Sequence, residues 1–366
     1  MHRFQRTLAG LDGRIDTPAP VVVVDALQRN IDRMQGFADA HGVALRPHVK
    51  THKSVEIGRR QLAAGAVGIT AGNVGEAEVF AAAGFTDVFI AYPVWPSGTK
   101  AARLRSLARR IRLRVGVDDP AAVAALADAM GDEPERLEVV VEIDCGGRRS
   151  GTSPDLAGEL AREARARGLL PVGVFTYPGH GGSAVEARER AARDQHDALE
   201  TAVRSLEAAG LAPHVVSAGS TPTAAYSTGG VVTEIRPGEY VFGDLDNTRL
   251  GACAEEDVAL FVASTVVSRQ VPRQAILDVG TKALGREGNP QKGYGAVAGG
   301  DAVLTRLNEY HGFLAVEGET PAVGTVLPLV PNHVCPVVAS FEELVATDAD
   351  GSTIERWPVD ARGRLS

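Results

Sequence analysis

The segment ALRPHVKTHKS, residues 44–54, contains two histidines, two lysines and an arginine within eleven positions. Imidazole groups transfer protons near neutral pH, and a lysine amine can bond covalently to an aldehyde. Burial and neighbouring cations lower the pKa of such an amine and make it a better nucleophile. The segment is therefore a candidate for catalytic chemistry, and a solvated loop with incidental charge is the alternative.

A loop that could bind phosphate lies in SAGSTPT, residues 217–223. Gly219, Ser220 and Thr221 follow a predicted strand and precede a short helical stretch, where backbone N–H groups and hydroxyls could hold a dianion. A reactive lysine and a phosphate loop are together what pyridoxal phosphate requires. A plain turn is the alternative for this loop.

Two further predicted strands end in polar residues. EIDCGGRRSG, residues 142–151, brings Asp144 and Arg149, and this arginine could contact a cofactor ring or a carboxylate, or form only a salt bridge. TYPGHGG, residues 176–182, brings Tyr177 and His180. A single histidine in a loop is more often solvated than catalytic.

The segment PNHVCP places His333 and Cys335 two residues apart. If the segment is an extended strand, both side chains project from one face and could bind a divalent ion such as Zn²⁺. Two protein ligands would leave positions open for water and a substrate oxygen. An accidental pair is the alternative.

Short β-branched runs alternate with Ala/Leu/Arg-rich stretches of helical length over the first 245 residues. About eight such units predict a closed parallel (β/α)₈ barrel, with a doubly wound sheet as the alternative. The carboxyl ends of barrel strands form the active-site mouth, where the polar segments above would meet. The predicted strands are 20–25, 44–49, 66–70, 87–92, 111–117, 137–143, 171–177 and 214–219.

The pattern changes after about residue 245 to strand-like runs with few helices. We therefore predict a barrel domain at 18–245 and a mostly-β domain at 246–366, with residues 1–17 packing against the second domain. GDLDNTRLGA would form the junction between them.

Composition limits the possible partners. A net charge of −8 with 23% charged residues provides no basic surface for nucleic acid or anionic membranes, so we expect a small-molecule substrate. Three scattered cysteines indicate a reducing compartment, and the N-terminus lacks the apolar core of a signal peptide. These features predict a cytoplasmic protein.

Taken together, the polar segments resemble the D-threonine aldolase and D-serine dehydratase family of pyridoxal-phosphate enzymes, whose barrel is similar to that of alanine racemase. RPHVKTHK combined with a distal His-x-Cys is the most specific part of the resemblance. The matching segments follow the family order and are RPHVKTHK, DCGGRRSG, TYPGH, GSTPT, EIRPGEYVFGD, ILDVGTKALG and PNHVCP.

The resemblance implies a role for each candidate residue. Lys50 would carry pyridoxal 5'-phosphate, and Arg149 and Tyr177 would contact the cofactor or substrate. His180, or a hydroxide on the metal, would be the candidate general base of aldol cleavage. The phosphate would be surrounded by Gly219, Ser220, Thr221 and Tyr240. A divalent metal ion, Mn²⁺, Zn²⁺ or Mg²⁺, would be bound by His333 and Cys335.

The resemblance also implies the reaction. The motifs are most similar to those of the low-specificity D-threonine aldolases, which predicts cleavage of D-threonine-like substrates to glycine and an aldehyde. The His-x-Cys pair favours the alternative, dehydration of D-serine or 3-hydroxy-D-aspartate. A racemase using Tyr294 or Tyr310, and a non-catalytic cofactor carrier, are more distant alternatives. The racemase-like families also imply a head-to-tail homodimer.

Overall fold

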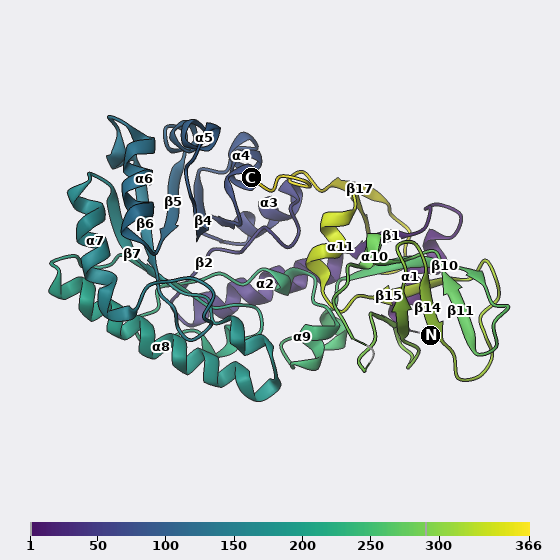
Figure 1. The fold of residues 1–366 in the computed structure, drawn as a ribbon. Coiled ribbons are helices and arrows are strands. Elements are labelled where there is room, and N and C mark those ends of the chain that lie inside the picture. Colours follow the sequence, from purple (N-terminus) through teal and green to yellow (C-terminus); the bar gives the residue numbers. More distant parts are fainter. Residues whose placement is uncertain (1, 290) are drawn as a thin grey trace. The chain divides into compact units, whose positions relative to one another are not determined.

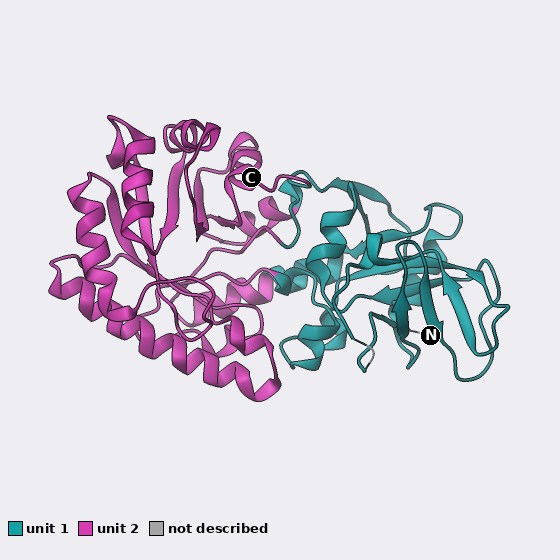
Figure 2. Cartoon of the chain, viewed as in Figure 1, with its two compact units in different colours: residues 1–31, 51–56, 239–362 teal, residues 32–50, 57–238, 363–366 magenta. Residues whose placement is uncertain are grey.

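The computed structural model describes residues 2–289 and 291–366 and contains two compact units (Figures 1 and 2). Unit 1 comprises residues 1–31, 51–56 and 239–362, and unit 2 comprises residues 32–50, 57–238 and 363–366. Among the helices of the described residues, none has both the length and the apolar content needed to cross a bilayer.

Unit 2 is built on eight parallel strands in the order β2-β9-β8-β7-β6-β5-β4-β3. Backbone bonds join the two ends of this sheet, because Val49 N donates to Thr70 O and Thr70 N donates to Pro47 O, each at 2.9 Å. The predicted parallel βα barrel is therefore confirmed. The strands are β2 (Ala44–Leu45), β3 (Ile69–Ala71), β4 (Asp87–Pro93), β5 (Arg112–Val117), β6 (Leu137–Glu142), β7 (Leu170–Phe175), β8 (Val215–Ala218) and β9 (Glu234–Ile235).

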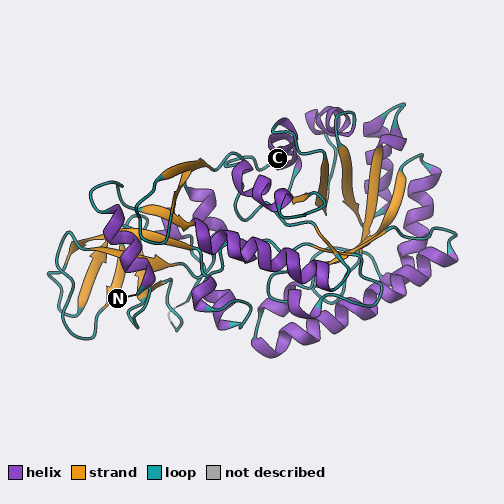
Figure 3. Cartoon of the chain, turned by 180° about the vertical axis from the view of Figure 1, so that it is seen from behind, coloured by secondary structure: helices purple, strands orange, loops and turns teal. Residues whose placement is uncertain are grey.

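Helices lie along the outer side of these strands (Figure 3). Asn73 and Asp119 cap two of them, because each side chain accepts a hydrogen bond from a backbone N–H of the first helical turn. The helices are α2 (Val24–Ala40), which begins in unit 1, α3 (Val55–Ala63), α4 (Val74–Ala82), α5 (Thr99–Ala108), α6 (Pro120–Met130), α7 (Ala157–Ala166) and α8 (Val185–Ala208). Short 3-10 helices are η1 (Pro134–Arg136), η2 (Pro154–Leu156), η3 (Gly179–Gly182) and η4 (Ala224–Tyr226).

A buried ionic group links three strands of the barrel. Arg46, which follows β2, is 2% exposed and donates to Glu234 of β9 and Asp87 of β4, each at 2.7 Å. Buried charges are tolerated only when they are paired and hydrogen-bonded, and these pairs meet that condition. The group ties together strands that are far apart in the sequence.

Unit 1 contains a mixed nine-stranded sheet whose main path is β13-β14-β11-β10-β1-β16-β17, with β15 also paired to β10 and β12 paired to β15. The predicted mostly-β character is confirmed. Its strands are β1 (Ala19–Val23), β10 (Leu260–Ser268), β11 (Gln274–Leu277), β12 (Ala296–Val297), β13 (Leu304–Leu307), β14 (Gly312–Ala315), β15 (Val326–Val330), β16 (Glu343–Thr347) and β17 (Glu355–Pro358). Its helices are α1 (Arg3–Leu11), η5 (Glu239–Val241), α9 (Leu245–Arg249), η6 (Glu255–Asp257), α10 (Thr281–Leu284) and α11 (Val334–Ser340).

One strand assignment from the sequence was wrong. The run at 20–25 is not the first barrel strand, because β1 pairs antiparallel with β10 and parallel with β16 in unit 1. A fully buried β-branched run fits the interior of either sheet equally well, so its pattern does not reveal its partner. The eighth barrel strand is instead β9, two residues that include the buried charge of Glu234 and therefore lack an apolar run.

Candidate functional site

Four loops that carry predicted site residues of unit 2 follow barrel strands at their carboxyl ends. Lys50 lies after β2, Arg149 after β6, Tyr177 after β7 and Gly219 after β8. Because all eight strands are parallel, these loops emerge at the same end of the barrel. This is the end at which barrel enzymes place their chemistry.

Two cationic groups lie near the Tyr177 ring. The Lys50 amine is 5.8 Å from the ring centroid, and the Arg149 guanidinium carbon is 4.9 Å from it. Cations within about 6 Å of an aromatic face are attracted by its quadrupole, so this ring orients both side chains. The structure thus brings together three residues that lie far apart in the sequence.

Glu142, at the end of β6, contacts Arg149 of this group. Its Oε1 accepts a hydrogen bond from the Ser150 hydroxyl at 2.8 Å and lies 3.4 Å from Arg149 Nη2. Burial raises the pKa of Glu142, and the Ser150 hydrogen bond and Arg149 oppose that rise. A small cavity of about 110 Å³ is lined by both Arg149 and Tyr177. A lysine amine beside an anchored guanidinium and an aromatic face fits the needs of an aldehyde cofactor with an anionic group.

The loop after β8 is compact and buried. Gly219 has φ +79°, and its N–H donates to the Gln195 side chain at 3.0 Å. The Ser220 N–H donates to the Thr223 hydroxyl at 3.1 Å. The Gly219 amide is therefore engaged by α8 and the Ser220 amide by the loop itself, where the Ser220 hydroxyl also lies 3.0 Å from the Thr223 hydroxyl. The phosphate-binding role of this loop stays a prediction.

His180 lies in η3 and pairs with a residue of α8. Its Nε2 is 3.0 Å from Asp194 Oδ2, and its Nδ1 is buried without a hydrogen-bond partner among the residues that the structure describes. The carboxylate fixes the orientation of the ring beside the glycine turn at Gly146 and Gly147. Its role as a base stays a prediction.

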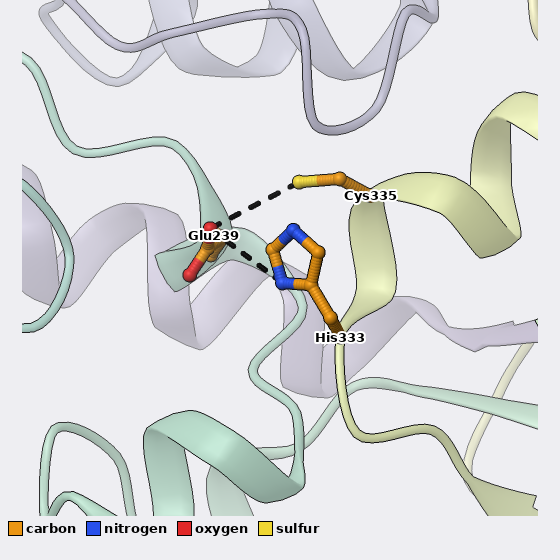
Figure 4. A group of neighbouring side chains, drawn as sticks. All are labelled: Glu239, His333 and Cys335. Carbon is orange, nitrogen blue, oxygen red and sulfur yellow. Dashed lines mark hydrogen bonds and ion pairs between the residues drawn. The ribbon is translucent and has the colours of Figure 1, made fainter. Parts of the chain in front are cut away.

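His333 and Cys335 come together with a third side chain in unit 1. Glu239 Oε1 lies 3.8 Å from His333 Nδ1 and 4.0 Å from the Cys335 sulfur (Figure 4). One potential ligand atom from each residue lies within 4.8 Å of those of the other two. Thiolate, imidazole and carboxylate are all ligands of Zn²⁺ and related ions, so the donor set fits a divalent metal.

The predicted extended strand at PNHVCP was wrong. His333 is the N-cap of α11, and Cys335 lies in the first turn of that helix. Pro336 also fits in this turn. The first N–H groups of a helix have no acceptor within the helix, so a proline, which lacks an N–H, removes no hydrogen bond there. The two side chains still converge, although the backbone bends between them.

Asp244 is a second carboxylate beside Nδ1 of His333. This carboxylate is fully buried, its Oδ2 lies 3.4 Å from His333 Nδ1, and the same oxygen accepts a hydrogen bond from Val334 N at 3.1 Å. Burial by itself lowers the pKa of His333, but Asp244, Cys335 and Glu239 raise it to about 12. The surrounding groups therefore stabilise positive charge at this position.

Glu239 and Asp244 were not predicted from the sequence as members of this group. Both lie in EIRPGEYVFGD, a segment that carries the family resemblance but in which only Tyr240, a buried residue of η5, was predicted as a site residue. Their ligand-like role depends on a contact with His333, about ninety residues away, and no local periodicity encodes such a contact. The high density of acidic residues directly after the barrel was the available hint.

Comparisons with known proteins give two family matches. The family described as "Alanine racemase, N-terminal domain" matches residues 22–246, and "Putative serine dehydratase domain" matches residues 259–347. A D-threo-3-hydroxyaspartate dehydratase from Delftia sp. is 41% identical, covering 94% of this chain and 97% of its own. A D-threonine aldolase from Arthrobacter sp. is 37% identical, covering 96% and 93%.

Solved structures of a D-threo-3-hydroxyaspartate dehydratase are also similar. A variant in which a cysteine is replaced by alanine, solved in a metal-free form, has a TM-score of 0.86 with 40% identity, covering 94% of this chain and 97% of its own. Another variant replaces the histidine two positions earlier and has a TM-score of 0.88. His333 and Cys335 have the same spacing.

Proposed function

Since this chain belongs to the alanine-racemase-like family of pyridoxal-phosphate enzymes that includes D-threonine aldolases and D-serine dehydratases, we propose that it dehydrates β-hydroxy-D-amino acids with the help of a divalent metal ion. The enzyme is a lyase, as its named relatives are. Substrates of the 3-hydroxy-D-aspartate or D-serine type would yield a keto acid and ammonia.

Lys50 is the residue proposed to hold pyridoxal phosphate and to move the α-proton of the substrate. When bound, the cofactor supplies an electron sink for the bond that breaks at Cα. Arg149 and Tyr177 would position the cofactor and substrate, since both already flank the lysine amine. Gly219, Ser220, Thr221 and Tyr240 are proposed for the phosphate.

His333 and Cys335 are proposed to hold the metal ion, which when bound supplies a Lewis acid that favours departure of the β-hydroxyl. The chain itself connects these ligands to the lysine. Thr51 follows Lys50 in the sequence, and its hydroxyl lies 3.4 Å from the Cys335 sulfur, which donates to it. An acid for the β-hydroxyl and a base for Cα are the two groups that elimination of water needs.

Cys335 is the observation that carries the choice of dehydration. The dehydratase relative has been studied as a cysteine variant in a metal-free form, and the cysteine–histidine spacing is the same here. A thiolate also donates more charge to the metal than a carbonyl or water oxygen would. We therefore rank dehydration above the aldol cleavage that the sequence motifs favoured.

Aldol cleavage is the second candidate, because a D-threonine aldolase is 37% identical over nearly the same length. This reaction removes a proton from the β-hydroxyl and breaks the Cα–Cβ bond, and it leaves the α-proton in place. His180, oriented by Asp194, is the candidate base for it.

The two reactions are distinguished by their products. We expect the purified holoenzyme to release 2-oxobutanoate and ammonia from D-threonine, and oxaloacetate and ammonia from 3-hydroxy-D-aspartate. Separate assays for ammonia and glycine measure the partition. Release of glycine and aldehyde in place of ammonia would contradict the dehydratase proposal and support the aldolase.

A further inference from the structure

We propose that Glu239 is a third protein ligand of the metal ion, so that the site has a Glu-His-Cys donor set selective for Zn²⁺-like ions over Mg²⁺. This inference rests on the proposed function, since it specifies the ion that would act at His333 and Cys335. Three protein ligands with one open position are the usual composition of a catalytic zinc site, whereas two ligands hold such an ion weakly.

Glu239 reaches this position because its backbone begins η5, which follows β9 after the three residues 236–238. Its carboxylate points toward both candidate ligands (Figure 4), with Oε1 at 3.8 Å from His333 Nδ1 and 4.0 Å from the Cys335 sulfur. Ligand atoms around one tetrahedral ion at about 2.0–2.3 Å lie about 3–4 Å apart. One potential ligand atom from each of the three side chains lies within 4.8 Å of those of the other two, so binding of one ion needs only small side-chain adjustments.

Asn247 fixes which carboxylate oxygen faces the site. Its Nδ2 donates to Glu239 Oε2 at 2.8 Å and also to Asp244 Oδ1 at 2.8 Å, and the residue is 2% exposed. Oε2 is thus occupied by a buried amide, and Oε1 is the oxygen turned toward the sulfur and imidazole. Partners of this kind orient ligands and are typical of metal sites.

Asp244 orients His333 in the way that Asn247 orients Glu239. Its Oδ2 lies 3.4 Å from Nδ1, which leaves the other ring nitrogen, on the side of Cys335 in Figure 4, as the donor to a metal. A carboxylate behind a histidine ligand fixes the tautomer and makes the ring a better donor. Glu239 is therefore oriented by Asn247, and His333 by Asp244. These two buried residues are also connected to each other, because the Asn247 backbone N–H donates a hydrogen bond to Asp244 Oδ1 at 2.8 Å.

The chemistry of the donor set selects the ion. Mg²⁺ prefers oxygen ligands in octahedral geometry, whereas a thiolate and an imidazole favour Zn²⁺ and similar ions. One carboxylate oxygen completes a mixed S, N, O set that Zn²⁺ accepts. An ordinary ion pair between Glu239 and His333 is the competing explanation, and it predicts no loss of metal affinity when Glu239 is neutralised.

The test measures the Zn²⁺ affinity of the protein. Holoenzyme that carries pyridoxal phosphate is stripped of metal and then titrated with Zn²⁺ in competition with a chromophoric chelator. We expect Glu239→Gln and Glu239→Ala each to weaken Zn²⁺ binding by at least about tenfold, as loss of a ligand or of its support does. Glu255→Gln is the matched control, because Glu255 also faces a histidine of unit 1, at 3.3 Å from His2 Nε2. This control should bind Zn²⁺ as the wild type does. Unchanged affinity in both Glu239 variants would overturn the inference.

Cobalt substitution separates failure of the inference from failure of the proposed function. In wild-type protein Co²⁺ should give a sulfur-to-metal charge-transfer band, which Cys335→Ser should abolish. Glu239→Gln should keep this band and change the intensity and position of the visible d–d bands. Identical visible spectra for wild type and Glu239→Gln would contradict the ligand role, whereas absence of any charge-transfer band in the wild type would contradict the metal site itself.

Discussion

At the residue scale, the chemistry of the barrel depends on an exposed lysine held beside an aromatic face. Lys50 follows a two-residue strand, and its amine lies 5.8 Å from the Tyr177 centroid. Arg149 approaches the same ring, so two cations share one aromatic neighbour.

Lys50→Arg should abolish covalent attachment of the cofactor and its visible absorbance, because a guanidinium keeps the charge but does not bond to the aldehyde. Turnover should fall by about 10²–10⁴-fold, as loss of a general base does. Lys53→Arg is the matched control and should retain both properties. Borohydride reduction followed by peptide mapping identifies the modified lysine, and attachment at Lys53 would refute the assignment.

The separate residues of the metal group were predictable to different degrees. The spacing of His333 and Cys335 singled them out because both residue types bind metals and lie close in the sequence. Glu239 escaped notice because its relation to them exists only after folding brings η5 beside the start of α11. A carboxylate in a loop is too common a feature to be selected without that contact.

At the element scale, the ends of the barrel sheet are joined through very short strands. β2 and β9 each have two residues, and they gain further support from the Arg46 side chain, which bonds to Glu234 and Asp87. Removing one member of a buried ionic group leaves the others without compensation. The closing strands are therefore expected to be sensitive to Arg46.

Arg46→Met should lower the free energy of unfolding by about 3–5 kcal/mol, the usual cost of breaking a buried ion pair. Arg167→Met, which removes an exposed pair with Glu163 on α7, should lower it by less than about 1 kcal/mol. Denaturant titrations of both variants measure the difference. Equal stability of the two variants would show that the buried group contributes little.

The same short strands explain where prediction from the sequence succeeded and where it failed. Alternation of apolar runs with helical stretches identified the barrel, because most of its strands are buried and β-branched. β9 was missed because its two residues include a charged side chain. β1 was assigned to the wrong sheet because strands of both sheets are buried on both faces, so its apolar pattern fits either sheet. Pairing partners are a long-range property that local composition does not encode.

At the scale of the whole molecule, the single chain leaves two of the proposed cofactor residues, Arg149 and Tyr177, open to solvent. The Arg149 side chain is 59% exposed, and Tyr177 is 38% exposed. Catalysis at a charged site benefits when water is excluded, and a second subunit is a common means of exclusion. We therefore keep the prediction of a homodimer.

Sedimentation equilibrium of the holoenzyme should give about twice the chain mass of 38.3 kDa. Turnover per chain should fall on dilution if a partner completes the site, because dissociation exposes it. A fully active 38.3 kDa species would contradict this prediction.

The central claim is that one substrate is processed by a cofactor on Lys50 and a metal ion at His333, Cys335 and Glu239. The most direct test measures ammonia release from 3-hydroxy-D-aspartate by holoenzyme before chelation, after thorough removal of divalent ions, and after Zn²⁺ is restored. Cofactor absorbance and melting temperature should change little on chelation, since the ion acts on the substrate rather than on the fold. We expect chelation to lower ammonia release by at least about 10²-fold, and we expect Zn²⁺ to reverse this loss in wild type but not in Cys335→Ala. Undiminished ammonia release by the metal-free enzyme would contradict the central claim.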